Sequence, residues 1–186
     1  MEMEMQNIYE TQRLYLKLSD PDMASAVLEY YFRNRKFLSP FEPKREAPFY
    51  EEAHQRALLE EDASNARLKR GFRFWLSLKS DPDRIMGMAA LNNIVWGAFQ
   101  SCFLGYKLDG SHLRRGYMTE AIEKLVEIGF KEIGLHRIEA NVMPRNKASL
   151  GVCEKAGFIY EGLSREYLNI NGVWEDHIHM VRLNKA

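Results

Sequence analysis

The chain has 186 residues, of which 46% are hydrophobic, 12% aromatic and 28% charged. This length and composition fit one globular domain with a sizeable core. Lysine plus arginine equals aspartate plus glutamate at 26 each, so the formal net charge is zero. That balance excludes a strongly basic surface over the whole molecule and gives no reason to expect direct nucleic-acid binding, although local basic patches remain open.

Hydrophobic periodicity and turn residues predict alternating strands and helices. In chain order the expected elements are a strand at 13–18, a helix opened by 19–21, a proline- and aromatic-rich connector at 37–50, a polar helix at 51–68, strands at 72–78, 85–91 and 102–108 with a turn at 81–83, a helix from about 119 to 133, a strand at 137–142, a short helix from 146 to 157, and strands at 164–169 and 177–183 joined by a turn at 171–172.

This order predicts the fold class α/β, of the α+β type. We expect a single domain at residues 8–186, with a mixed, mostly antiparallel central sheet of about seven strands flanked by helices. Residues 1–7 are expected to form a flexible extension. The substrate-facing rim of the domain is one interpretation of the connector at 37–50, and a packed connector is the other.

Cysteine usage and the N-terminus favour a cytoplasmic protein without membrane attachment. Cys102 and Cys153 cannot form a disulfide framework, and no metal-ligand spacing is present. His177 and His179 are two apart on a predicted strand, which is more typical of surface or core histidines than of zinc, so no metal is expected. Residues 1–5 are acidic, unlike a signal peptide, and no apolar run approaches the ~20 residues of a membrane span.

The most informative segment leads from strand 102–108 into the following helix. The first N–H groups of a helix lack partners within the helix, and together with the helix dipole they form an anion site. Gly116 lets the backbone approach a phosphate, and Arg114 and Arg115 add positive charge beside it. A plain turn with two solvated arginines is the alternative. The segment therefore predicts a site for a diphosphate.

The glycine spacing narrows the choice of diphosphate. There is no G-x-x-x-x-G-K-[ST] motif, which argues against a P-loop nucleotide site. Gly105, Gly110 and Gly116 do not match G-x-G-x-x-G, which argues against a Rossmann dinucleotide site. Coenzyme A is the remaining common ligand that contains a pyrophosphate.

A second segment surrounds the start of the short helix at 146–157. Asn146 is placed to cap this helix, and Ser149 falls one turn later on the same face. Arg145 and Lys147 either reach a phosphate or are solvated residues of the helix start. Cys153 has no histidine beside it in the sequence, so we interpret it as a buried, inert thiol rather than a nucleophile.

Together the two segments resemble the acyl-coenzyme A core of the GCN5-related N-acetyltransferases. Residues 113–118 align with that family's Q/R-x-x-G-x-G/A signature, although Leu113 and Met118 depart from it. Because backbone N–H groups bind the pyrophosphate in that family, these departures are tolerable. The family's N-x-x-S/A motif is matched from Asn146, and its E-K-x-G-F closure is matched from Glu154.

The resemblance extends over nearly the whole chain. The patterns YYxxNRxFLxPxEP at 30–43 and NINGVWEDH at 169–177 are similar to the ribosomal-protein-alanine N-acetyltransferases. Those enzymes acetylate the N-terminal alanine of a small-subunit ribosomal protein. The resemblance implies acetyl-CoA as cosubstrate and a protein N-terminus, that of a ribosomal protein, as acceptor.

Two other functions stay open. One is acetylation of a small amine such as a polyamine, an amino acid or an antibiotic, since paralogues in this subfamily acetylate other amines. The other is a non-catalytic acyl-CoA-binding module. An open groove would fit a chain terminus, whereas a closed acidic pocket would fit a small amine. The sequence also leaves open whether the protein is a monomer or a dimer.

The resemblance assigns coenzyme contacts to the two segments. The implied residues are Leu104, Gly105, Arg114, Arg115, Gly116, Tyr117, Met118, Thr119, Asn146 and Lys147. It implies that a backbone N–H at Leu104 or Gly105 binds the thioester carbonyl. The tyrosine that the family often uses as the acid is replaced by Cys153, so Ser149 is expected to protonate the thiolate. Asn146 would position the pantetheine arm beside it.

The acceptor amine must be neutral when it attacks the thioester. A chain-terminal amine has a pKa of roughly 7.7–8.0, so deprotonation near pH 7 costs only about 1 kcal/mol, whereas an amine with a pKa near 10.4 costs roughly 4–5 kcal/mol. A weak base therefore suffices for a chain terminus. Glu42 in the connector and Glu139 on strand 137–142 are the candidates, with a structural or solvated carboxylate as the alternative for each.

Overall fold

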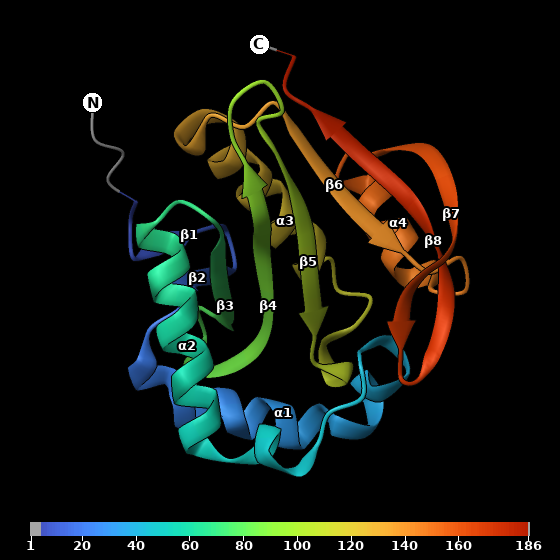
Figure 1. Cartoon of the computed structure of the whole chain (residues 1–186). Helices are drawn as coiled ribbons and strands as arrows, with labels where there is room; N and C mark the ends of the chain where they lie inside the picture. The colour runs from blue at the N-terminus through green and yellow to red at the C-terminus, as the bar shows by residue number, and fades with distance from the viewer. Residues whose placement is uncertain (1–4, 186) are drawn as a thin grey trace.

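The computed structural model describes residues 5–185, and its centre is one eight-stranded sheet (Figure 1). The strands lie in the order β1-β2-β3-β4-β5-β6-β8-β7, and every described neighbouring pair is antiparallel except β5 with β6. The strands are β1 (Ile8–Glu10), β2 (Leu14–Leu18), β3 (Phe72–Leu78), β4 (Asp81–Val95), β5 (Ser101–Leu108), β6 (Arg137–Val142), β7 (Ile159–Ile170) and β8 (Val173–Leu183). The predicted mixed sheet is confirmed, with one strand more than expected.

Two layers of helices enclose the sheet. The helices are α1 (Ala24–Leu38), α2 (Glu52–Arg67), α3 (Tyr117–Glu127), which continues as a π-helix over Ile128–Ile133, and α4 (Lys147–Lys155). Helices α1 and α2 cover the face seen in front in Figure 1, and α3 and α4 cover the other face. Trp75, Met88 and Ala90 belong to the buried cluster under α1 and α2, whereas the larger cluster packs against α3. After the roles that the resemblance implies, we call the face under α1 and α2 the acceptor face and the face under α3 and α4 the coenzyme face.

Two helix boundaries follow the predicted sequence signals. Asp20 caps a 3-10 turn at Pro21–Met23 that leads into α1, and its side chain accepts a hydrogen bond from the Asp22 N–H. Gly157, just past α4, has φ +78°, the left-handed conformation expected of a C-terminal glycine. The proline- and aromatic-rich connector contains two 3-10 turns, at Ser39–Phe41 and Ala47–Tyr50.

The hairpin turn predicted at 81–83 is wrong. The β3–β4 turn lies at residues 79–80, and Asp81 already pairs with Leu78 as the first residue of β4. The register shifts on both sides of Ser77, so the ladder is irregular where Pro82 enters β4. A proline can stand in a strand where the ladder is bulged or only beginning, which is why its sequence signal resembled a turn.

The N-terminal segment makes contacts with the domain that the sequence did not indicate. Strand β1 was not predicted because three residues are too few to show a periodicity. Within the expected extension, Met5 packs against the core and the Asn7 carbonyl accepts a hydrogen bond from the Leu18 N–H. Residues 1–4 of that extension lie outside the described residues.

The β7–β8 hairpin is longer than the two predicted strands. Its turn at Asn171–Gly172 has φ +49° and +86°, the pattern of the tight hairpin turn expected from this residue pair. The register slips between Ser164 and Leu168, and the outer residues of β7 are largely exposed. Because these residues are exposed and the strand is bulged, β7 lacks the alternation of apolar and polar residues that would have predicted where it begins.

Strands β5 and β6 separate after a short parallel contact. They pair at three positions, the last being Phe103 with Glu139, although β5 continues to Leu108 and β6 to Val142. Both strands run in the same direction and each is followed by a helix, so the N-termini of α3 and α4 lie at the same edge of the sheet. Residues 104–108 therefore border an opening on the side of β6, where no ladder occupies their backbone groups.

Candidate active site

The loop that follows β5 is held in place by α1. Asp109 accepts hydrogen bonds from the Ser111 N–H (2.9 Å) and from Arg33 Nε (2.8 Å), and the Asn34 side chain accepts one from the Gly110 N–H (3.0 Å). Burial by itself would raise the pKa of Asp109, but the hydrogen bonds from Ser111 and Arg33 outweigh it and hold the pKa well below its ordinary value. The loop is thus fixed before any ligand binds.

Gly116 stands at the N-cap of α3 with φ +77°, a left-handed conformation that side chains rarely adopt. No side chain caps the first turn of α3, so its free N–H groups are available to an anion. Arg13, directly before β2, supports the loop by donating to the Arg115 carbonyl oxygen at 2.9 Å and pairing with Glu120 at 2.7 Å.

The side chains around Gly116 divide into three groups by their exposure. Arg114 and Arg115 are exposed, and neither side chain has a partner within residues 5–185. Met118 is 5% exposed and packs in the core, so only its backbone faces the loop. Tyr117 and Thr119 are half-buried, with the Arg13 guanidinium 4.5 Å from the centre of the Tyr117 ring.

The N-terminus of α4 brings the second predicted group together. The Asn146 side chain accepts a hydrogen bond from the Ser149 N–H at 3.2 Å, so the predicted N-cap is confirmed. The Ser149 hydroxyl lies 2.6 Å from the hydroxyl of Tyr106, which reaches across from β5. Cys153 is fully buried, with its sulfur 3.1 Å from the same tyrosine hydroxyl.

Tyr106 is the residue that sequence reasoning missed at this site. Its hydroxyl can donate to the Ser149 carbonyl oxygen at 3.0 Å or to the Ser149 hydroxyl at 2.6 Å, where either oxygen can be the donor. Burial, followed by the contacts with Cys153, raises the pKa of Tyr106 well above its ordinary value, so the phenol stays protonated. The tyrosine fixes the position of Ser149. The alternation of β5 could have placed Tyr106 on the face of α4, but only the structure shows the contact.

Burial raises the pKa of the Cys153 thiol, and the hydrogen bond to Tyr106 only partly opposes it. A buried thiol with a raised pKa is a poor nucleophile. The expected packed, unreactive thiol is consistent with this environment.

The two basic residues around Asn146 differ. Arg145 bonds Glu175 of β8 at 2.8 Å and the Pro40 carbonyl oxygen at 2.8 Å, so it ties the β7–β8 hairpin to the connector rather than reaching a phosphate. Lys147 is exposed, with no side-chain partner within the described residues.

Glu42, the first candidate base, is engaged in ion pairs. Its carboxylate bonds Lys107 of β5 and lies 3.9 Å from Arg45. Its carbonyl oxygen accepts a hydrogen bond from the Asn171 N–H, which joins the connector to the hairpin turn. The contacts of Glu42 join the connector to β5 and to the hairpin, and they occupy the carboxylate that was expected to serve as a base.

Glu139, the second candidate, belongs to a hydrogen-bonded chain across three strands. It accepts from Arg137 at 2.8 Å and from His179 Nδ1 at 2.7 Å, and His179 Nε2 lies 2.7 Å from the Ser164 hydroxyl. Burial would raise the pKa of Glu139, but the hydrogen bonds from Arg137 and His179 lower it overall. An ionised carboxylate only accepts, so the Nδ1 of His179 carries the proton and Nε2 can accept one.

The sequence prediction did not include His179 or Ser164 in the site. The two-residue spacing of His177 and His179 put both on one face, but it gave no sign of their partners. His177 is buried and its Nδ1 lies 2.9 Å from the Glu175 carbonyl oxygen. The two histidines therefore have separate hydrogen-bond partners.

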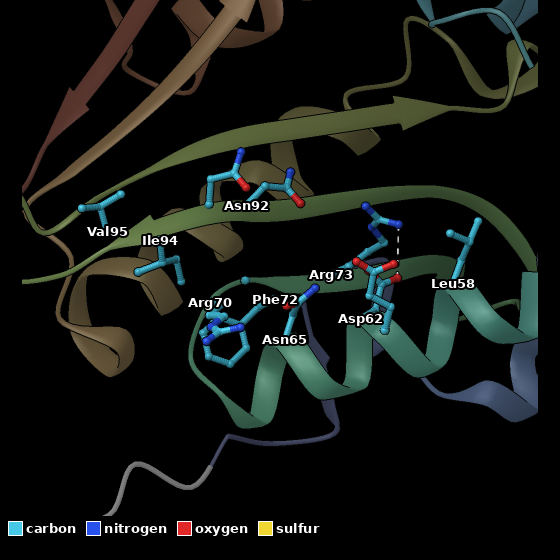
Figure 2. A pocket seen from close by; sticks show the side chains of 12 residues that line it. Leu58, Asp62, Asn65, Arg70, Phe72, Arg73, Asn92, Ile94 and Val95 are labelled. Carbon is cyan, nitrogen blue, oxygen red and sulfur yellow. Dashed lines mark hydrogen bonds and ion pairs between the residues drawn. The ribbon is translucent and has the colours of Figure 1, made fainter.

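A groove of ≈ 550 Å³ opens on the acceptor face between α2 and strands β3 and β4 (Figure 2). Arg73 pairs in register with Ala90, and Ala90 pairs with Gly105, so these residues lie in one row leading to β5. Asn92 lines the groove, and its amide nitrogen would lie 3.1 Å from a Cβ placed on Gly105. Neither Ala90, which is fully buried, nor Gly105 is among the residues that line the groove, so the groove ends at Asn92 on this side.

Comparison with known proteins agrees with this geometry. The acetyltransferase (GNAT) domain model matches residues 13–159, so the chain belongs to the GNAT acetyltransferases. It is 40% identical over 171 residues to the probable N-acetyltransferase YjcK of Bacillus subtilis, covering 92% of this chain and 94% of that one. It is 37% identical to the [ribosomal protein uS5]-alanine N-acetyltransferase of Escherichia coli, covering 90% and 86%.

Solved structures give the same result. The ribosomal-protein-S5-alanine acetyltransferase of Vibrio fischeri superposes with a TM-score of 0.91 at 32% identity, covering 96% of this chain and 97% of that one. RimJ of Mycobacterium smegmatis, in complex with CoA-disulfide, superposes with a TM-score of 0.89 at 25% identity, covering 96% and 87%. The chain is therefore an N-acetyltransferase of the GNAT fold, and coenzyme A occupies a close structural relative. None of the described helices has the length and apolar character needed to cross a membrane.

Proposed function

We propose that this protein transfers the acetyl group of acetyl-CoA to the N-terminal α-amine of a protein, with a ribosomal protein that begins with alanine as the first candidate. The 37% identity to a uS5-alanine N-acetyltransferase carries this assignment. Such a substrate would place the protein in the cytoplasm, and we assign the activity to a domain formed by residues 8–186.

On this proposal the coenzyme lies along the coenzyme face. The free N–H groups of the first turn of α3, beyond Gly116, bind the pyrophosphate, and the unpaired Arg114 and Arg115 add positive charge. Successive N–H groups of a strand point to opposite sides, so one of Leu104 and Gly105 directs its N–H into the opening beside β6. That N–H would bind the thioester oxygen and stabilise the charge that develops on it.

The reaction needs two proton transfers. The neutral amine attacks the thioester carbon, the C–S bond breaks, and the departing thiolate takes a proton from the Ser149 hydroxyl that Tyr106 holds in place. Ser149 then regains a proton from solvent, which receives the proton that the amine loses. Asn146 fixes the first turn of α4, and with it the position of Ser149. The amine gives up its proton on the acceptor face.

For that proton we assign the pair formed by Glu139 and His179. Glu139 on β6 pairs in register with Phe103 on β5, at the point where these two strands separate. Its carboxylate orients His179 through Nδ1. Glu42 is the weaker candidate because Lys107 and Arg45 already neutralise it. The requirement for a base is modest, about 1 kcal/mol for a terminal α-amine, and an imidazole is a common general base.

A thiol-release assay tests the proposed function. Purified protein is incubated with acetyl-CoA and a panel of peptides starting with alanine, serine or methionine, alongside polyamines and free amino acids. We expect release with the alanine peptides, and mass spectrometry should locate the acetyl group on the α-amine. A panel that turns over polyamines or amino acids but no peptide would contradict the assignment and favour the small-amine function.

A second measurement separates binding from turnover. Acetyl-CoA should raise the melting temperature, because a ligand that binds the native state stabilises it by mass action. No shift at millimolar acetyl-CoA would contradict the placement of the coenzyme. A clear shift with no turnover on any amine would instead favour a non-catalytic acyl-CoA-binding module.

A further inference from the structure

We propose that Ser164, His179 and Glu139 form a nucleophilic triad that hydrolyses small carboxylic esters through an acyl-serine. This activity goes beyond acetyl transfer, because it forms a covalent intermediate on the protein and needs no coenzyme A. The three residues come from the neighbouring strands β7, β8 and β6, so the order of the sheet brings them together.

The hydrogen bonds of the three residues follow the order of a serine nucleophile, its base and the carboxylate that orients the base. The Ser164 hydroxyl lies 2.7 Å from His179 Nε2, and His179 Nδ1 lies 2.7 Å from a Glu139 carboxylate oxygen. An ionised carboxylate only accepts, so Nδ1 carries the proton and the lone pair of Nε2 is free. The Ser164 hydroxyl therefore donates to Nε2, at a distance over which a proton can be transferred.

Glu139 is held in the ionised form that this role requires. Arg137 donates to its second carboxylate oxygen at 2.8 Å, and the hydrogen bonds from Arg137 and His179 lower the pKa of Glu139 although burial opposes them. An ionised carboxylate stabilises the imidazolium that forms when His179 takes a proton from Ser164. The ring of Tyr167 packs edge-on against the imidazole, with 5.1 Å between the ring centres, and this contact further restricts its orientation.

A small ester can reach the serine. Ser164 is half-buried, and the side chain of His179 is 19% exposed. Figure 1 shows α4 behind β8 and β7, and none of the helices within residues 5–185 lies in front of these two strands. The triad therefore lies on a part of the acceptor face that no described helix covers.

The backbone beside Ser164 can supply donors for the oxygen of the ester. Strand β7 is the last strand of the sheet, so alternate N–H groups along its outer edge face away from the ladder. The register slips after Ser164 and resumes at Leu168, and of the residues between them Glu166 already donates its N–H to the Asp176 side chain. An N–H of this edge can stabilise the negative charge that develops on the carbonyl oxygen during attack.

The proposed reaction has two steps. The Ser164 oxygen attacks the ester carbonyl carbon while its proton moves to His179 Nε2; the bond to the alcohol breaks, and the leaving alkoxide takes that proton. Water then attacks the acyl-serine and gives a proton to Nε2, and the departing Ser164 oxygen takes this proton as the carboxylic acid is released. Nε2 holds one proton at a time, so it serves either this serine or the acceptor amine.

Ester hydrolysis without coenzyme A tests the triad. Release of 4-nitrophenol from 4-nitrophenyl acetate is measured for the parent protein and for three variants. Ser164→Ala and His179→Gln should each lower kcat/KM at least about 100-fold, and the double variant should lose no more, because nucleophile and base act as one unit. Ser80→Ala, at an exposed serine in the β3–β4 turn, is the matched control and should keep the parent rate.

Covalent labelling locates the nucleophile independently of turnover. An alkyl fluorophosphonate should phosphonylate Ser164, whose oxygen displaces fluoride, and peptide mass spectrometry should find the label at this residue in the parent protein and in Ser80→Ala. Melting curves show that each variant is folded. Parent-like ester hydrolysis in folded Ser164→Ala, or a label absent from Ser164, overturns the triad. Acetyl transfer to peptides is measured separately with acetyl-CoA, so its failure overturns the proposed function and not the triad.

Discussion

The two faces of the sheet are built in different ways. The coenzyme face takes its proposed contacts from one stretch between Leu104 and Cys153, and it relies on backbone N–H groups and helix starts. The acceptor face is assembled from α2 and from strands β3, β4, β6, β7 and β8, and it relies on side chains such as Asn92, Glu139 and His179. Backbone groups survive substitution, whereas side chains do not. We therefore expect coenzyme use to tolerate sequence change more than acceptor choice does.

The largest expected effect is on the coenzyme face. If the Ser149 hydroxyl protonates the thiolate, Ser149→Ala should lower kcat by roughly 10²–10⁴. KM for acetyl-CoA should change little, since the lost interaction is made only in the transition state. Cys153→Ala is the control and should leave turnover nearly intact. If Ser149→Ala is fully active and Cys153→Ala is inactive, the catalytic role belongs to the cysteine. If both variants lose activity and melt at lower temperatures, the substitutions have disturbed the packing of α4.

The matching change on the acceptor face is His179→Gln. The amide keeps a hydrogen-bonding group near Glu139 and Ser164 but cannot accept the proton, so kcat should fall about 10²-fold, the lower end for a positioned base. The affinity for acetyl-CoA should be unchanged, which separates this face from the other. The pH–rate profile is the informative measurement, because the acid-side limb should be altered in the variant. A profile identical to that of the parent would show that His179 is only structural.

Gly116 tests whether the backbone alone binds the pyrophosphate. Valine at this position must adopt φ +77° and places a branched side chain where the phosphate approaches, so the dissociation constant for coenzyme A should rise at least tenfold. Gly134→Val is a matched control, since Gly134 has φ +81° at the far end of the same helix. Both variants should lose stability, but only Gly116→Val should lose affinity by calorimetry. Equal affinities would place the phosphate elsewhere.

Tyr106 is expected to act through Ser149. Tyr106→Phe removes the hydroxyl that holds Ser149, and losing one such hydrogen bond should lower kcat about tenfold with little change in KM. In the double variant Tyr106→Phe/Ser149→Ala the effects should not add, because both residues serve one proton transfer. Tyr160→Phe, at an exposed tyrosine of β7, should be silent. Additive losses in the double variant would indicate separate roles.

The smallest expected effect concerns the stability of the loop after β5. The folded-state pKa of Asp109 is depressed, so its contribution to stability is present above the ordinary pKa of about 3.9 and is lost as the pH falls through the lower folded value. Asp109→Asn should lower the melting temperature by about 4 °C at pH 7, and the gap should narrow from pH 4 downward. Asp81→Asn, at an exposed aspartate, is the control. A gap that is constant with pH would contradict the assigned ion pair with Arg33.

Local signals explain which parts of the site could be predicted. Asn146 as an N-cap, Gly116 before α3 and the Asn171–Gly172 turn each depend on a few neighbouring residues, and the structure contains all three. Strand β1 and the true β3–β4 turn were missed because three residues carry no periodicity and Pro82 mimics a turn. The pairings of Glu42 with Lys107 and of Glu139 with His179 join residues 65 and 40 positions apart, and no spacing rule reports such contacts.

The sequence by itself determined the layered α/β fold, the helix starts that follow β5 and β6, and the resemblance to acetyl-CoA-dependent enzymes, because periodicity, capping and glycine conformation are local properties of the chain. The tertiary structure alone decided that Tyr106 meets Ser149, that His179 bridges Glu139 and Ser164, and that the Asn92 amide lies over Gly105. These side chains come from different strands and helices, so strand order and register bring them together.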